Sequence, residues 1–274
     1  MNKLPTMFAI ARRAARWGAL AVVSLVAMSV SAQSPELTAS TTVTAPVAAP
    51  VTPDPGAQMR QHVYAMARAY RGVQDYTATF YKQERVNGEL LPVETIEMKF
   101  RKPFGVYMHW LSGDFAGREV LYVRGWNDDK IHAHPGSFPD ITVNLRPDSS
   151  LAMRGNRHPI TKAGFGETIR LLVKDAKLAE SRPQDDVQYT DLGEWEIHGT
   201  RSHCIEARAP GGDAGPYYAP RAKICFNVKT KMPTRVSTWD AEDNLVEDYS
   251  YADVRLNPGL TDADFDPENA DYNF

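Results

Sequence analysis

The chain has 274 residues, of which 43% are hydrophobic and 24% are charged, with 31 basic and 34 acidic side chains. Four of the basic residues lie in the first 32 positions, so the rest of the chain carries 27 basic and 34 acidic residues, a net charge of −7. A domain this acidic is poorly suited to bind nucleic acid, or to adhere to anionic lipid through charge alone. We therefore expect no nucleic-acid partner.

Residues 1–32 have the pattern of a secretory signal peptide. A basic region without acidic residues precedes the apolar stretch 19–30, and small residues lead to a cut after Ala32. The twelve residues of this stretch are too few to span a bilayer, which argues against the alternative of a retained membrane anchor. No cysteine lies near the cut, so the chain is not expected to be a lipoprotein. The pattern predicts a mature protein in the periplasm, without stable membrane insertion.

Residues 33–56 are rich in proline, alanine and threonine, and they contain almost no charge and, apart from Leu37, no large apolar side chain. This composition is typical of a flexible linker. The remaining residues, 57–274, contain no internal repeat, and we expect them to form one domain.

Two helices are predicted in this domain, over residues 57–73 and 163–180. Apolar side chains recur at intervals of three or four residues in both segments, which gives each helix an amphipathic stripe. The stripe residues are Met59, Val63, Met66 and Tyr70 in the first helix, and Phe165, Ile169 and Leu172 in the second.

Most of the domain instead alternates between apolar and polar residues, which is the pattern of strands. Asn87-Gly88 is a strong hairpin signal between the first two of them. Many strands, few helices and short links predict a mainly β (α+β) domain with one large, curved antiparallel sheet and helices against its apolar face. We expect strands at residues 75–86, 89–101, 104–111, 119–124, 130–134, 142–145, 151–153, 187–192, 195–198, 202–209, 221–228, 234–240 and 245–251.

The segment 96–110 stands out because two consecutive strands present one broad apolar surface. Apolar residues alternate with charged ones up to Pro103, which cannot donate a ladder hydrogen bond, and the alternation then resumes. Such a face must be covered by a helix, another sheet or an apolar ligand. Its large side chains include Ile96, Met98, Phe100, Val106, Met108 and Trp110.

Cys204 and Cys225 are the only cysteines, and an even count in an exported protein favours a disulfide. Both lie in alternating segments that flank the turn-rich loop 210–216, so a hairpin places them opposite each other on the polar outer face. Ile224 and Phe226 then face the apolar side. A thiol redox pair is the alternative, but the chain has no Cys-x-x-Cys motif.

No motif in the sequence indicates catalysis. The chain lacks the Gly-x-Ser-x-Gly elbow of many hydrolases and the glycine fingerprint of dinucleotide-binding proteins. His132 and His134 share one face of a predicted strand and could form a metal pair, but no third ligand has a matching spacing. We therefore expect neither an enzyme nor a cofactor or metal site.

Four segments carry a resemblance to a known family: Tyr70–Tyr76 (YRGVQDY), Arg101–Phe104 (RKPF), His158–Gly164 (HPITKAG) and Asp253–Phe265 (DVRLNPGLTDADF). In these segments the chain resembles a bacterial domain-of-unknown-function family of exported proteins. That family is similar to the LolA/LolB lipoprotein-carrier superfamily, which includes the sensor protein RseB and mycobacterial lipid-binding lipoproteins. The resemblance implies an unclosed half-barrel whose concave side is capped by helices.

The resemblance also implies a function, namely a non-catalytic periplasmic carrier that holds the acyl chain of a lipid or lipoprotein. The alternative is a sensory or protein-interaction module of the cell envelope, of the RseB type and without bound lipid. Arg101, Lys102 and Arg118 could meet a headgroup at the rim, or simply keep the surface soluble. The residues expected to line the cavity, or else to be ordinary core, are Ile96, Met98, Phe100, Val106, Met108, Trp110, Ile224 and Phe226.

Overall fold

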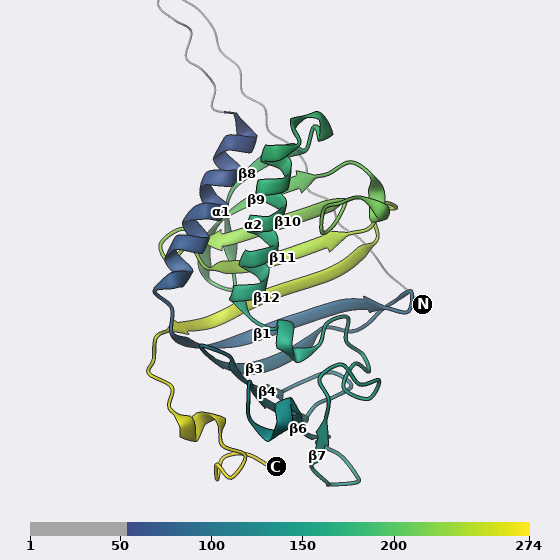
Figure 1. Cartoon of the computed structure of the whole chain (residues 1–274), viewed down its shortest axis with the longest axis vertical. Coiled ribbons are helices and arrows are strands. Elements are labelled where there is room, and N and C mark those ends of the chain that lie inside the picture. Colours follow the sequence, from purple (N-terminus) through teal and green to yellow (C-terminus); the bar gives the residue numbers. More distant parts are fainter. Residues whose placement is uncertain (1–53) are drawn as a thin grey trace, which may run out of the picture. The chain divides into compact units, whose positions relative to one another are not determined.

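An open antiparallel sheet of twelve strands dominates the computed structural model, which describes residues 54–274 (Figure 1). Its strands follow the order β7-β6-β5-β4-β3-β1-β12-β11-β10-β9-β8, and β2 pairs only with β1. The edge strands β7 and β8 do not pair with each other, so the predicted class, a mainly β unclosed sheet with two helices, is confirmed. The predicted signal peptide and nearly all of the predicted linker lie outside the described residues.

The two helices are α1 (Pro55–Arg71) and α2 (Phe165–Ser181). The strands are β1 (Asp75–Val86), β2 (Glu89–Leu90), β3 (Glu94–Arg101), β4 (Gly105–Trp110), β5 (Glu119–Val123), β6 (Ile131–His134), β7 (Val143–Leu145), β8 (Gln188–Ile197), β9 (Thr200–Arg208), β10 (Arg221–Asn227), β11 (Pro233–Trp239) and β12 (Leu245–Leu256).

Four predicted strands differ from the observed ones. The segment 89–101 is divided into β2 and β3, because Pro92 lies between them and has no N–H to donate. The segments 187–192 and 195–198 belong to one strand, β8, which continues through a bulge between Asp191 and Gly193. Residues 151–153 form a turn rather than a strand, held by the bond from the Met153 N–H to the Ser149 carbonyl.

We call the face of the sheet that packs against the helices the inner face. The alternation predicted for residues 96–110 is confirmed, because the six large apolar side chains named above are buried on this face and Phe104 is partly buried. The register places them in rows across β1, β3 and β4, for example Phe80, Ile96 and Trp110. Side chains in such rows lie about 5 Å apart, close enough to pack as one continuous layer.

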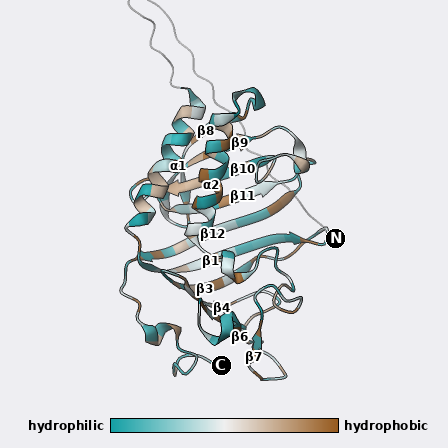
Figure 2. Ribbon diagram, in the orientation of Figure 1, coloured by the Kyte–Doolittle hydropathy of each residue, from teal (hydrophilic) through white to brown (hydrophobic). Residues whose placement is uncertain are grey.

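Both helices run across strands β8 to β12 (Figure 1). Figure 2 shows hydrophilic and hydrophobic residues interspersed along them, as expected of amphipathic helices. In α1 the buried residues include Met59, Val63 and Met66 of the predicted stripe. The helix begins two residues earlier than predicted, because the Asp54 side chain accepts hydrogen bonds from the N–H groups of Gly56 and Ala57.

The second helix begins where the chain passes close to the sheet. Gly164 precedes α2 with a φ of 90°, and a Cβ at this position would lie 2.4 Å from the Tyr76 Oη. The Tyr76 hydroxyl accepts a hydrogen bond from the Phe165 N–H at 3.2 Å, and the two rings stack with centroids 4.4 Å apart. Only glycine suits this conformation and this contact.

The helices cover only part of the inner face. A helix of 17 residues is about 25 Å long, so one that crosses strands spaced about 4.8 Å apart reaches about five of them. Both helices therefore extend no further than strands β8 to β12. The inner face of the remaining strands is covered by residues 135–164, which we call the roof segment and which include only β7 and a 3-10 turn, Ile160–Lys162.

The outer face is also covered in part, by the chain beyond β12. Phe265 is fully buried against β4 and β5, and the ring of Tyr272 stacks on Tyr107 at a centroid distance of 3.9 Å. Glu119 on β5 is buried beneath this segment and accepts hydrogen bonds from the Tyr107 hydroxyl and from Asn273. Strands β4 and β5 are therefore packed on both faces.

Cys204 and Cys225 are directly opposite each other in β9 and β10 and form the predicted disulfide. The prediction that they lie on a solvated outer face is wrong, since both are 0% exposed. Ile197 and Leu192 pack over them from β8, where the bulge near Gly193 lets the edge strand fold across the bond. The disulfide thus belongs to a small second apolar cluster.

Replacing both cysteines, Cys204→Ala and Cys225→Ala, should lower the free energy of unfolding by about 3 kcal/mol, because the bond closes a loop with a sequence separation of 21 residues. Guanidinium denaturation measured by circular dichroism tests this. Reducing agent should destabilise the native protein equally and leave the double variant unaffected. Equal midpoints for the native protein and the variant would contradict the expectation.

Candidate ligand-binding cavity

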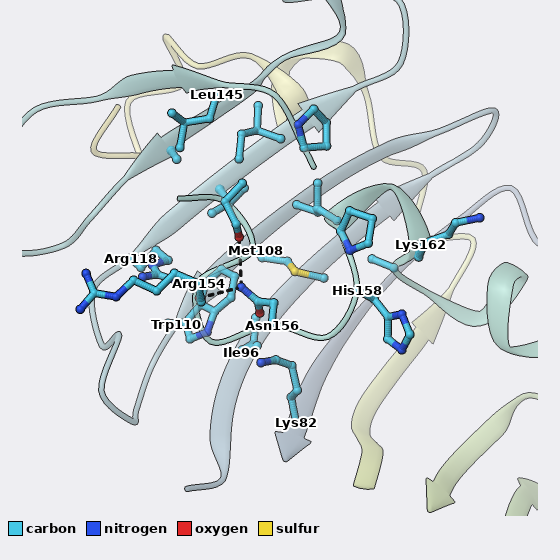
Figure 3. A pocket seen from close by; sticks show the side chains of 18 of the residues that line it. Lys82, Ile96, Met108, Trp110, Arg118, Leu145, Arg154, Asn156, His158 and Lys162 are labelled. Atoms are coloured by element: carbon cyan, nitrogen blue, oxygen red, sulfur yellow. Dashed lines mark hydrogen bonds between the residues drawn. The ribbon is translucent and has the colours of Figure 1, made fainter. Parts of the chain in front are cut away.

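A cavity of about 510 Å³ lies between the inner face of the sheet and the roof segment (Figure 3). This volume is within the range of about 300–1,000 Å³ found for small-molecule sites. Most of its lining is apolar. The floor residues include Phe80, Ile96, Met108, Trp110, Val120 and Tyr251, and the roof residues include Ile141, Val143, Leu145, Leu151, Ala152 and Ile160.

Three of the eight residues predicted to line a cavity, Ile96, Met108 and Trp110, lie on its floor. The other five are buried in the core and do not line it; Ile224 and Phe226 lie on β10, which the helices cover, and Phe100 lies near the first residue of α2. The covering contacts are aromatic: Phe100 stacks on Tyr76 beneath Phe165, and Phe226 packs against His62 of α1. These five residues are Met98, Phe100, Val106, Ile224 and Phe226.

Of the three basic residues proposed for a rim, only Arg118 lines the cavity. Arg101 pairs with Asp262 at 2.6 Å on the outer face. Lys102 donates to the Tyr70 carbonyl at 2.8 Å, at the end of α1.

The two histidines considered as a metal pair have separate partners. His134 forms an ion pair with Asp140 at 2.6 Å, and the ring of His132 lies beside Phe274. Within residues 54–274 no group of three or more His, Cys, Asp or Glu side chains is placed to hold a metal ion. In the same part of the chain, no helix is long and apolar enough to cross a lipid bilayer.

The roof segment exposes large apolar side chains around the cavity. Ile141 is 60% exposed and Leu151 is 57% exposed although both line the cavity, and Phe138 beside them is 96% exposed. Exposed apolar groups that adjoin an apolar cavity are typical of binding sites rather than of an inert surface. These exposed cavity residues could not be predicted from the sequence, because the roof segment has no periodic pattern of apolar residues.

Buried charges hold the roof to the sheet at one side of the cavity. Lys82, on the inner face of β1, forms ion pairs with Glu94 at 2.6 Å and with Glu84 at 3.4 Å. It also donates to the carbonyl of Gly155 in the roof at 3.3 Å. Glu84 accepts a hydrogen bond from the roof N–H of Arg157 at 2.9 Å. Because side chains alternate between the two faces of a strand, Lys82 and Glu84 lie on the same face as Phe80. Their position on the inner face could therefore have been predicted from the sequence.

A second buried carboxylate, Glu247 on β12, binds the next residues of the roof. It accepts hydrogen bonds from His158 at 2.7 Å and from the Arg157 side chain at 3.1 Å. The Tyr218 hydroxyl, which comes from the loop between β9 and β10, also bonds to it at 2.9 Å. Three segments distant in sequence therefore meet at one carboxylate that is 2% exposed.

The electrostatics of this contact favour an ionised pair. The hydrogen bond to Glu247 raises the pKa of His158 above its ordinary value of 6.5, against the opposing effect of burial. Burial acts to raise the pKa of Glu247, but the bonds from His158 and Tyr218 outweigh it and lower that pKa overall. The cluster is best explained as an anchor for the roof.

Together, the fold and the cavity define a class of protein: a mainly β protein with an open antiparallel sheet, whose helices cover one half and whose roof encloses an apolar cavity over the other. Residues 73–274 match the family described as protein of unknown function (DUF1571), and the chain belongs to this family. The predicted relationship to a domain-of-unknown-function family is thus confirmed. No curated protein sequence matches the chain.

Several solved structures are similar at low identity. The Pseudomonas aeruginosa MucA/MucB complex matches at 12% identity and a TM-score of 0.42, over 76% of this chain and 60% of that one. The Mycobacterium tuberculosis lipoprotein LppX matches at 14% and 0.45, over 75% and 98%. The LolA superfamily protein NE2245 from Nitrosomonas europaea matches at 10% and 0.31, over 76% and 97%. These are the kinds of relative that the sequence resemblance named, but the values are too low to carry an inference about ligand or partner.

The substitution Lys82→Met should destabilise the protein by about 3 kcal/mol or more, because it leaves Glu84 and Glu94 buried without their shared cation. Urea denaturation provides the measurement. The matched control is Lys130→Met, which removes an exposed pair with Asp128 and should change stability by about 0.5 kcal/mol at most. Similar losses in the two variants would argue against the anchoring role of Lys82.

The His158 contact predicts a pH dependence. Because the folded-state pKa of His158 is raised, its stabilisation is fully present below its unfolded value of 6.5 and is lost as pH rises through the folded value. We expect a loss on the order of 1 kcal/mol on going from about pH 6 to about pH 9, since the ring is partly exposed and screened.

Thermal unfolding across this range measures the effect. His158→Gln should flatten the profile, whereas His132→Gln should not, because burial lowers the pKa of His132 and its contribution to stability therefore increases rather than decreases with rising pH. A profile that is unchanged by His158→Gln would contradict the assignment.

Proposed function

We propose that the protein is a non-catalytic, exported binding protein that holds the acyl chain of a lipid or lipoprotein in the cavity beneath the roof segment. The observation that carries the proposal is the cavity itself, about 510 Å³ in volume and lined mainly by apolar side chains. Water gains few hydrogen bonds in such a space, so an apolar ligand is favoured there. The disulfide supports export to an oxidising compartment.

The chemistry of the lining suits a flexible chain. Met108 on the floor is unbranched and polarisable, and Trp110 and Tyr251 provide flat apolar surfaces. The exposed side chains of Ile141 and Leu151 extend the apolar surface from the interior to solvent. A ligand could therefore enter past the roof without crossing the packed outer face.

Native mass spectrometry of the protein purified from the periplasm tests the proposal directly, and we expect a bound mass that solvent extraction identifies as a lipid. A consistently empty protein that also fails to bind the neutral probe N-phenyl-1-naphthylamine would overturn it. Affinity capture that returns one defined envelope protein and no lipid would favour the alternative of a sensory module.

The substitution Ala152→Trp should weaken binding of the naphthylamine probe by about tenfold or more, because the indole would occupy space inside the cavity. Probe fluorescence gives the dissociation constant. Ala116→Trp is the matched control, since Ala116 is exposed and does not line the cavity. If both variants bind like the native protein, the probe occupies some other site.

A further inference from the structure

One end of the cavity carries cations that have no partner. Arg118 and Arg154 both line the cavity, and in Figure 3 they lie on the same side as Trp110, away from His158 and Lys162. Neither guanidinium forms an ion pair or side-chain hydrogen bond with any residue that the structure describes. Most other cations near the cavity, among them Lys82, Arg157 and Lys162, do have carboxylate partners.

Local packing holds the two arginines together. The Arg118 guanidinium lies 3.6 Å from the centroid of Phe115, and a Cβ on Gly155 would lie 2.8 Å from the same ring. Phe115 thus contacts both Arg118 and the residue that follows Arg154. Burial lowers the pKa of Arg118, and the charge of Arg154 lowers it further, which places the two cations within electrostatic range.

The carboxylate whose charge acts on Arg118, that of Glu94, does not neutralise it. Glu94 acts to raise the pKa of Arg118, but its own ion pair is with Lys82, at 2.6 Å, and Glu84 shares that same lysine. Arg118 is partly buried whereas Arg154 is exposed, and their like charges repel each other. An anion between them would relieve this repulsion.

A third unsatisfied group lies at the same end. The indole N–H of Trp110 is buried and has no hydrogen-bond partner among the described residues, although Trp110 is only 5% exposed. Buried donors are rarely left without an acceptor, because an unpaired buried N–H loses the hydrogen bond that it makes with water when exposed. The ring also lies 5.6 Å from the Arg118 guanidinium carbon.

We infer that the ligand is an amphiphile with an anionic oxyacid headgroup, a carboxylate or a phosphate, that is bound by Arg118, Arg154 and the Trp110 N–H while its chain fills the apolar cavity. This inference rests on the proposed function and adds the chemical class of the ligand. The net charge of −7 outside the first 32 residues does not oppose it, because exposed charges beyond about 10 Å are screened at 0.1 M salt.

Competition against N-phenyl-1-naphthylamine tests the inference with three ligands that differ in headgroup: palmitate, palmitoyl lysophosphatidic acid and neutral hexadecanol. At least one anionic ligand should bind about tenfold more tightly than the alcohol, a difference of about 1.4 kcal/mol. The anion that shows the greater preference identifies the headgroup as a carboxylate or a phosphate. The preference should shrink as salt is added.

The double substitution Arg118→Gln and Arg154→Gln should abolish this preference while hexadecanol binds as before. The control Arg124→Gln removes an arginine that lies 5.0 Å from the Phe104 ring but outside the cavity, and it should keep the preference. If the native protein binds the anions and the alcohol equally, or if the double variant keeps the preference, the proposed headgroup site is wrong. Either result leaves the proposed function standing. Failure of the probe and all three ligands to bind overturns the proposed function as well.

Discussion

The inner face of an open sheet must be kept from water across its whole width, and this constraint shapes the rest of the structure. Two helices are long enough to cover only strands β8 to β12. An irregular roof covers the other strands, and it has little internal structure to hold its position. Its position depends instead on buried charges, above all Lys82 and Glu247, which bind roof atoms from the sheet. The cavity remains because such a roof, unlike an amphipathic helix, does not fill the layer beneath it.

The same arrangement separates two physical environments within a short distance. One side of the cavity is a closed ion network in which Lys82, Arg157 and His158 each have a carboxylate partner. Next to this network, where Lys82 binds the Gly155 carbonyl, Arg118 and Arg154 have no carboxylate partner among the described residues. The paired groups are suited to stability, whereas the partly buried Arg118 and the exposed Arg154, which lack such partners, are suited to recognition of an anion. The apolar lining of the cavity contacts an elongated apolar ligand equally well in either direction. The charged groups around it must therefore determine which way the ligand lies.

Strand positions, both helices and the disulfide pairing could be predicted from the sequence, because period-2 and period-3.6 patterns report directly on which face is buried. The site could be predicted only in part. Ile96, Met108 and Trp110 lie in the cavity while Met98 and Phe100 belong to the core, although all five share one apolar face. What separates them is where the helices end, a tertiary distance that no local pattern encodes. The roof was missed for a related reason, since its proline-rich segment has no period.

The two edges of the open sheet have a consequence for how the protein behaves at high concentration. Unpaired strand edges are templates for pairing with another copy, and long flat ones promote aggregation. Strand β7 has only three residues, too few for a stable ladder. Strand β8 is longer, but the bulge near Gly193 interrupts its regular pairing edge, and Asp191, Glu194 and Glu196 give it negative charge. The sheet can therefore keep two unpaired edge strands, β7 and β8, without pairing with other copies of the chain into fibres.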